Sequence, residues 1–227
     1  MSAFQTGPFS FEPSPRGLRR NGVSARGWTL SYGCASLATR TLPDGLTQSE
    51  IRDAFASDIG AFVEQAKTEN RPMRINLVDA ETDTIVAGFF SHSMCGLTPG
   101  LIDDRSRYWL QSPDRSYSRD VTLSEFAELA ARYAAPENSW IAGLLPDEVL
   151  TTDPDVWRAP SSWEIRHVVG EGSFTGISGA SAAKLVGVTP QNFRKYTAAD
   201  TAKTRQKMGF AMWHYLLNRL RITSTRI

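Results

Sequence analysis

The sequence has few of the features that mark membrane, secreted or disulfide-bonded proteins. It contains no run of 18 apolar residues, so no membrane span is expected. At the N-terminus the basic residues follow the apolar ones and a long apolar core is missing, which is not the pattern of a secretory signal. The only two cysteines, Cys34 and Cys95, lie in different contexts. We therefore expect no disulfide, a reducing cytoplasm, and two small core residues.

Residues for catalysis and for cofactor binding are equally sparse. The three histidines lie far apart, and no spacing among them and the cysteines matches a metal site. The sequence has neither a P-loop nor a dinucleotide-binding fingerprint. Residues 91–93, SHS, and Cys95 invite comparison with a nucleophile, but no partnered acid or glycine elbow accompanies them. We therefore expect no enzymatic activity, no cofactor and no metal.

What the sequence does have is a strong separation of charge. The 227 residues carry a net charge of only +1. Residues 161–227 contain ten Lys or Arg against three Asp or Glu, whereas residues 31–160 contain eleven against twenty. Residues 1–30 contain four against one. A basic C-terminal part on an acidic body predicts two partners, a polyanion for the first and a basic surface for the second.

Three smaller groups of residues each have two interpretations. Arginines near the N-terminus are either an arm for nucleic acid or scattered surface charge: Arg16, Arg19 and Arg20. Five acids either meet a basic partner or occupy solvated turns: Asp79, Glu81, Asp83, Asp103 and Asp104. Trp157 and Trp163 are expected to anchor packing rather than to form a binding platform.

Turn signals and periodicity predict the elements along the first part of the chain. Residues 1–30 are rich in Gly, Pro and Arg, which indicates turns and short extended pieces. A capping box at residues 47–50 opens an amphipathic helix that ends near residue 70. Residues 74–90 predict a β-hairpin, because two β-branched runs flank AETD. A second capping box at residues 122–125 opens another helix.

Residues 179–197, GASAAKLVGVTPQNFRKYT, have the pattern of a helix-turn-helix. Ser178 can cap the first helix, and Ala183 supplies a small side chain where two helices cross closely. Gly187 can take the positive φ at which that helix must turn. The pattern therefore predicts a short helix that ends in a tight turn.

The second helix of this motif is expected to begin at Thr189 as its cap, with Pro190 in its first position. Phe193 would point into the core, with Tyr196 one turn on. Apolar residues upstream and downstream predict the flanking helices: Trp163, Ile165, Val168 and Val169 before the motif, and Phe210, Trp213, Leu216, Leu217 and Leu220 after it.

The polar and basic side chains of the motif are candidates for DNA contacts, because Arg and Lys read guanine edges whereas Gln and Asn read adenine edges. The predicted base and phosphate contacts are Ser178, Thr189, Gln191, Asn192, Arg194, Lys195, Arg205 and Lys207. Many repressors carry a phosphate-contacting Gln where this chain has Gly179, so that contact is either missing here or made by Ser178. The other interpretation of the whole segment is a helical hairpin with a solvated basic face.

Together these observations predict an α+β fold, mixed in its N-terminal and middle regions and all-α at its C-terminal end. We expect an N-terminal α/β domain with a hairpin at residues 1–95 and a mainly helical dimerisation region at residues 96–155. The helix-turn-helix DNA-binding domain would occupy residues 156–227, after a proline-rich boundary at residues 153–162.

Several stretches resemble type I-F anti-CRISPR proteins fused to an anti-CRISPR-associated helix-turn-helix regulator. The likeness is carried by GEGSFTGISGASAAKLVGVTPQNFRKYTAAD and AMWHYLLNRL, and further upstream by WTLSYG, TLPDGLTQSEIRDAF and PDEVLTTDPDVWRAPSSWEIRHVVGEG. It is most specific from Trp157 onward. The resemblance implies a phage or mobile-element protein that acts as a homodimer in the cytoplasm of a bacterial host.

The same resemblance implies two activities without catalysis. The protein would bind the RNA-guided type I-F surveillance complex and prevent target DNA from pairing with the guide. It would also bind an inverted repeat in its own promoter and repress its operon. The residues that contact the complex stay open. The alternative function is a mobile-element transcriptional regulator whose N-terminal domain dimerises or senses a ligand.

Overall fold

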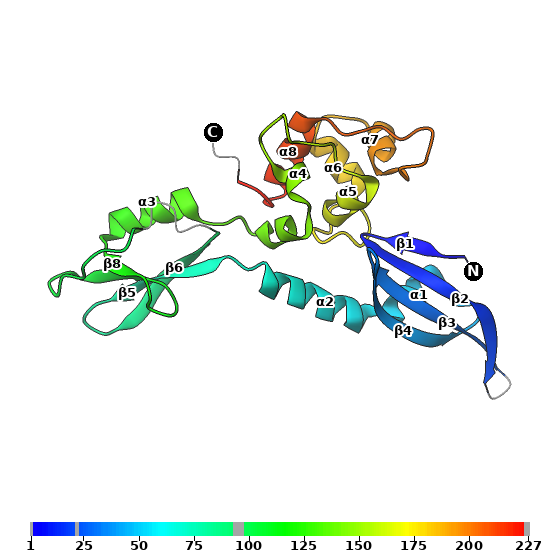
Figure 1. Ribbon diagram of the computed structural model, residues 1–227, viewed down its shortest axis with the longest axis horizontal. Coiled ribbons are helices and arrows are strands. Elements are labelled where there is room, and N and C mark those ends of the chain that lie inside the picture. Colours follow the sequence, from blue (N-terminus) through cyan, green and yellow to red (C-terminus); the bar gives the residue numbers. More distant parts are fainter. Residues whose placement is uncertain (1, 21–22, 93–97, 225–227) are drawn as a thin grey trace.

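The computed structural model describes residues 2–20, 23–92 and 98–224. It confirms the α+β class, with two antiparallel four-stranded sheets and the helices of the C-terminal region. Figure 1 shows the second sheet as a separate lobe at the left, joined through α2 and a second segment to the first sheet and the C-terminal helices. Across the described residues, none of the helices combines the length and the apolarity needed to cross a bilayer.

The first sheet has the order β1-β2-β3-β4 and runs through the N-terminal region. Its strands are β1 (Phe4–Thr6), β2 (Phe9–Arg20), β3 (Val23–Tyr32) and β4 (Ala35–Pro43). The expectation of turns and short pieces in residues 1–30 is therefore wrong. Prolines are tolerated in β2 because Pro13 borders a register shift, and because β1 pairs only as far as Phe11.

Two helices cover this sheet, α1 (Gln48–Ala54) and α2 (Ala56–Glu69). The capping box between Thr47 and Glu50 is confirmed, with both reciprocal hydrogen bonds present. The single predicted helix is interrupted at Phe55, which ends α1 and precedes α2. The core between sheet and helices includes Phe9, Phe11, Trp28, Leu30, Ile51 and Phe55.

The second sheet has the order β6-β5-β7-β8 and packs against one helix. Its elements are β5 (Met73–Asp79), β6 (Thr84–Ser91), β7 (Tyr108–Gln111), β8 (Ser118–Asp120) and α3 (Leu123–Tyr133). The hairpin predicted at residues 74–90 is confirmed as β5 and β6. Because β7 pairs with β5, this sheet extends across the boundary expected at residue 95, and long-range pairing of that kind leaves no local signal.

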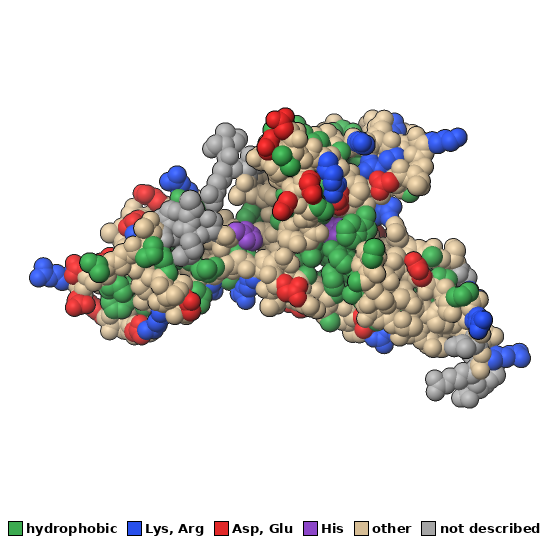
Figure 2. Space-filling model, viewed as in Figure 1, with side chains coloured by type: hydrophobic (Ala, Val, Ile, Leu, Met, Phe, Trp, Pro, Cys, Tyr) green, Lys and Arg blue, Asp and Glu red, His purple; other side chains and the backbone are tan. Residues whose placement is uncertain are grey.

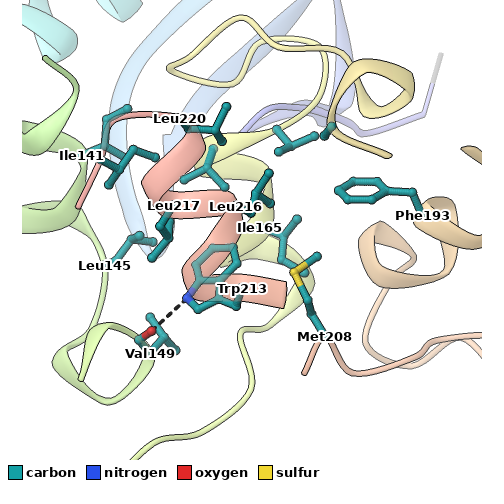
Figure 3. Close-up of a cluster of buried hydrophobic side chains, with 14 of the residues drawn as sticks. Ile141, Leu145, Val149, Ile165, Phe193, Met208, Trp213, Leu216, Leu217 and Leu220 are labelled. Atoms are coloured by element: carbon teal, nitrogen blue, oxygen red, sulfur yellow. Dashed lines mark hydrogen bonds between the residues drawn. The ribbon is translucent and has the colours of Figure 1, made fainter. Parts of the chain in front are cut away.

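The remaining helices form one cluster with a shared apolar core. They are η1 (Ser139–Leu144), α4 (Asp147–Leu150), α5 (Ser162–Val168), α6 (Gly179–Leu185), α7 (Pro190–Thr197) and α8 (Phe210–Arg219). Figure 3 shows Trp213 at the centre, where its indole N–H donates to the Val149 carbonyl at 2.8 Å. Ile141 and Leu145 belong to the same core. The segment before residue 156 thus packs as part of the helix-turn-helix unit, not apart from it.

Candidate nucleic-acid interface

Both helices of the predicted motif begin at the residues expected from the sequence. The Ser178 hydroxyl accepts a hydrogen bond from the Ser181 N–H at 3.1 Å, at the start of α6. The Thr189 hydroxyl accepts one from the Asn192 N–H at 3.2 Å, at the start of α7, and Pro190 occupies the first position. Each cap satisfies a backbone donor that a helix start would otherwise leave unpaired.

The turn between the two helices depends on a glycine. Gly187 has φ +71°, a left-handed conformation that confirms the expectation. The Val188 N–H donates to the Ala183 carbonyl at 3.0 Å, and the Gly187 N–H donates to the Lys184 carbonyl at 3.4 Å. This pair of bonds is the Schellman pattern that ends a helix. A Cβ added at Gly187 would meet no atom within 4 Å, so only the backbone conformation requires glycine.

The inner face of the motif is apolar and closely packed. Ala182 and Ala183 are fully buried, and Phe193 is 1% exposed. These side chains share a core with Ile165 of α5 and Leu216 of α8. The requirement for a small residue at the crossing is therefore met at Ala183, and Phe193 and the half-buried Tyr196 attach α7 to this core.

The outer face of α7 is polar, with Gln191, Asn192 and Arg194 exposed and Lys195 half-buried. At 100° per residue, Gln191 and Lys195 point most directly away from the buried Phe193, with Arg194 and Asn192 to either side. Among the described residues, no side-chain hydrogen bond or ion pair engages any of these four polar residues. Figure 2 shows Lys and Arg side chains over this corner of the molecule. The face can therefore meet an anionic partner without breaking an internal contact.

Arg205 does not belong to this free surface, so the structure does not support its prediction as a DNA contact. Its side chain is 8% exposed and forms an ion pair with Asp200 at 3.1 Å. It also donates to the carbonyl of Pro160 at 3.0 Å and to that of Gln206. Asp200 in turn accepts hydrogen bonds from the N–H and hydroxyl of Ser162. The guanidinium is therefore used to hold the loop after α7 against the start of α5.

Other cations around the motif are available. Lys207 is exposed, as expected. Sequence reasoning missed Lys184, exposed in the last turn of α6, and Lys203, exposed in the loop after α7. The only sequence signal for these two lysines was that they lie close to the motif along the chain. Ser178 and Thr189 use their hydroxyl oxygens as caps, and the Thr189 O–H stays free to donate to a phosphate.

A buried polar pair fixes α5 to the first sheet. His167 is fully buried, and its Nε2 lies 2.7 Å from the hydroxyl of Tyr32 on β3. Its Nδ1 lies 2.9 Å from the carbonyl of Trp163, so Nδ1 carries the proton and Nε2 accepts from Tyr32. Burial lowers the pKa of His167 to about 4 and raises the pKa of Tyr32 to about 12. Both groups are therefore neutral, as this hydrogen bond requires.

Further contacts join the same two parts of the molecule. The indole N–H of Trp163 donates to the Pro8 carbonyl at 3.0 Å, so this residue is a packing anchor, as expected. Arg166 donates to Gln5 of β1 and to the Thr197 carbonyl at the end of α7 at 3.2 Å. No local sequence pattern predicts these partners, because they lie 31 to 161 residues apart. The helix-turn-helix therefore has a defined position on the first sheet.

The remaining candidates have structural explanations where the structure describes them. Asp79 accepts from the N–H groups of the following turn, and Asp103 from the N–H of Arg105, as expected for turn residues. Trp157 packs edge-on against Phe210 with ring centroids 5.3 Å apart. Cys34 is exposed in the β3–β4 turn, so its placement in the core was wrong, whereas Cys95 lies outside the described residues. Within residues 2–20, 23–92 and 98–224, no group of side chains is able to hold a metal ion.

No protein-family model matches the chain, and a search of curated proteins found no match either. The assignment of a function therefore depends on the geometry of α6 and α7 and on the resemblance carried by the sequence stretches quoted above.

Proposed function

We propose that the protein binds operator DNA through α7 and represses its own operon. The observation that carries this proposal is the outer face of α7, where Gln191 and Lys195 point away from Phe193 and have no internal partner. Helix-turn-helix proteins insert the second helix of the motif into the major groove. Lys195 and Arg194 would then read guanine, Gln191 and Asn192 would read adenine, and Thr189 and Lys207 would bind phosphate.

The same proposal includes a homodimer, because a two-fold dimer reads an inverted repeat. The second-sheet lobe supports this part, since it exposes large apolar side chains that a partner copy could cover. Ile85 and Val86 on the edge strand β6 are 58% and 52% exposed, and Leu123 at the start of α3 is 54% exposed. Unpaired strand edges with apolar side chains are surfaces that chains pair through.

The second activity, inhibition of a type I-F surveillance complex, is proposed from the resemblance and from charge. Residues 31–160 carry twenty acids against eleven basic residues. Such a body suits the positively charged channel in which RNA-guided complexes hold guide and target. An acidic surface there would compete with target DNA. No catalytic step is part of this proposal.

One substitution tests whether the two activities are separate. Arg194→Ala is expected to lower operator affinity by at least about tenfold, the loss of one good base contact, and to leave inhibition of the surveillance complex unchanged. Electrophoretic mobility shift measures the first effect, and a target-DNA binding assay with the purified complex measures the second. Arg132→Ala, an exposed arginine of α3, is the charge-matched control. Loss of both activities in a folded Arg194→Ala protein would refute the separation of roles.

A ligand-sensing regulator is the second candidate, favoured by a cavity of about 590 Å³ between β1 and the helix-turn-helix. Gln5, Arg166, Glu171 and Thr197 line it, so an occupant would touch both parts. Light scattering of the protein mixed with a type I-F complex, in excess competitor DNA, distinguishes the candidates. A stoichiometric assembly supports the inhibitor, and its absence leaves the regulator.

A further inference from the structure

The outer half of the β2–β3 hairpin is a ribbon with charge of one sign. Residues 13–30 contain four arginines and no Asp or Glu. We call the part that carries Arg16, Arg19 and Arg26 the arginine hairpin. Figure 1 shows this hairpin extending beyond the rest of the first sheet, at the lower right. Pairing with β4 reaches only as far as Ala25, and pairing with β1 ends at Phe11, so the end of the hairpin is two-stranded.

The strand register brings two of its arginines, Arg19 and Arg26, to one face. Gly17 pairs with Arg26 and Arg19 pairs with Ser24, so these four residues share a face of the ribbon. The residues opposite these two arginines on the neighbouring strand, Gly17 and Ser24, are small. A Cβ added at Gly17 would meet only the Ala25 carbonyl oxygen, at 4.0 Å, which leaves open space above the ribbon between the two arginines.

These cations are poorly neutralised within the protein. Arg16 and Arg19 are exposed, and neither forms an ion pair with any described residue. The nearest acid to Arg26 is Asp44, whose carboxylate lies 3.8 Å from Nε, and that nitrogen has no hydrogen bond. Surfaces usually mix charges of both signs, so a patch of one sign indicates a charged partner.

The opposite end of the same strands touches the helix-turn-helix. Tyr32 at the end of β3 bonds His167, and Pro8 just before β2 bonds Trp163. From Tyr32 to Val23 the strand makes nine steps, which is about 30 Å at ~3.3 Å per residue. In Figure 1, α7 and the end of the hairpin lie toward the same side of the molecule, at its upper and lower corners.

We propose that the arginine hairpin binds the phosphate backbone of duplex DNA at a distance from the bases contacted by α7 that is fixed by the first sheet. A two-stranded β-ribbon is one of the elements that fit against duplex DNA, and arginine binds phosphate in a bidentate manner. The sheet acts as a rigid spacer between the two contacts. The distance between them rests on the DNA-binding function proposed for α7, whereas the phosphate contact itself does not.

The test compares two double variants with the wild-type protein. Arg16→Ala/Arg19→Ala removes two exposed cations from the hairpin. Arg105→Ala/Arg107→Ala removes two exposed cations from the second-sheet lobe and is matched in charge. Fluorescence anisotropy measures binding over a series of salt concentrations. The probes are a duplex selected by the wild-type protein with about 10 base pairs of flank on each side, the same site without flanks, and a random-sequence duplex.

On the flanked duplex, the hairpin variant is expected to bind about tenfold more weakly than the control at low salt. The slope of log affinity against log salt should fall by about two, since each lost phosphate contact contributes about 0.9. Both variants should bind the site without flanks equally. Equal affinity and equal slope for both variants on the flanked duplex would overturn the proposal. With a single-stranded RNA as a fourth probe, a loss confined to that RNA, with duplex binding intact, would overturn the proposal in favour of an RNA contact.

The two proposals fail in different ways. If the wild-type protein selects no duplex sequence, the function proposed for α7 is wrong and so is the fixed distance between the two contacts. The salt slope on random-sequence duplex still decides whether the hairpin binds phosphate. If a site is selected and Arg194→Ala abolishes its recognition while the hairpin variant has no effect, α7 keeps its function and the hairpin does not.

Discussion

The C-terminal helices and the second-sheet lobe gather their buried side chains in different ways. The core around Trp213 draws on residues from Ala66 of α2 to Ile222, and includes the first sheet's supporting helix. The core of the lobe lies entirely between Ile75 and Tyr133. Among the described residues, the lobe joins the rest of the chain through the segments that follow α2 and α3.

This difference indicates which parts move together. The helix-turn-helix is attached to the first sheet by Trp163, Arg166 and His167, so its position relative to the arginine hairpin is set. The lobe has its own core and exposes Ile85 and Val86 at its edge. A self-contained lobe with an apolar edge suits contact with a second copy or a partner, whereas the shared core suits the precise placement of α7.

The largest expected effects on stability come from substitutions that create a cavity in each of the two cores. Trp213→Ala removes a fully buried indole and its hydrogen bond, and should lower the free energy of unfolding by about 4 kcal/mol. Leu110→Ala makes the matched cavity in the lobe, where the side chain is also fully buried, and should cost about 3 kcal/mol.

Hydrogen exchange measured by mass spectrometry locates each loss. We expect faster exchange across α4 to α8 for Trp213→Ala, and across β5 to α3 alone for Leu110→Ala, with operator affinity retained in the second variant. If Leu110→Ala also increased exchange in α6 and α7, the two parts would form one cooperative unit and the comparison would fail.

A pH titration sharpens the same comparison through the histidines. Burial holds the pKa of His167 at about 4, against 6.5 in an unfolded chain. Between these values the unfolded chain takes up the proton and the folded protein does not. This stabilisation is therefore complete above pH 6.5 and is lost as the pH falls toward 4, with a total of about 3 kcal/mol.

Chemical denaturation at several pH values measures this effect. In His167→Gln the slope of stability between pH 4 and 6.5 should flatten, because the titrating group is absent. His92→Gln in the lobe is the control, and should alter the slope much less because that side chain is exposed. An unchanged slope in His167→Gln would show that the pair with Tyr32 does not govern acid sensitivity.

The smallest expected effects distinguish the roles of two basic residues in the loop after α7, Arg205 and Lys207. Arg205→Ala should lower the free energy of unfolding by about 1.5 kcal/mol, since its guanidinium holds Asp200 and the carbonyl of Pro160. Lys207→Ala should leave stability unchanged and weaken DNA binding, because Lys207 is exposed. Thermal unfolding and anisotropy together check the pair. A stable Arg205→Ala protein with weakened DNA binding alone would restore Arg205 to the interface.

Local signals predicted the helix-turn-helix closely. Ser178, Thr189 and Pro190 mark helix starts through their own side chains, and Gly187 marks the turn through its backbone freedom. Such signals act over three or four residues, so a single sequence reveals them. The first sheet was missed because its strands contain prolines and arginines, which are not typical of strands. These segments are extended because they pair with one another, and that pairing leaves no local signal.

The features of the candidate site likewise differ in whether neighbouring residues alone could predict them. The outward face of α7 followed from helical periodicity around Phe193, which the sequence contains in full. The contacts of the Arg205 side chain could not be predicted from the sequence. Asp200 and Pro160 come close to it only when the loop after α7 folds back to α5.

By itself the sequence determined where the motif helices start and turn, and which of their side chains face away from the core. Only the tertiary structure decided which cations are free, how α5 is joined to the first sheet through His167, and that Arg19 and Arg26 of the hairpin share a face. The physical reason is distance along the chain. Caps and periodicity arise between neighbours, whereas pairing, burial and ion pairs join residues that the sequence keeps far apart.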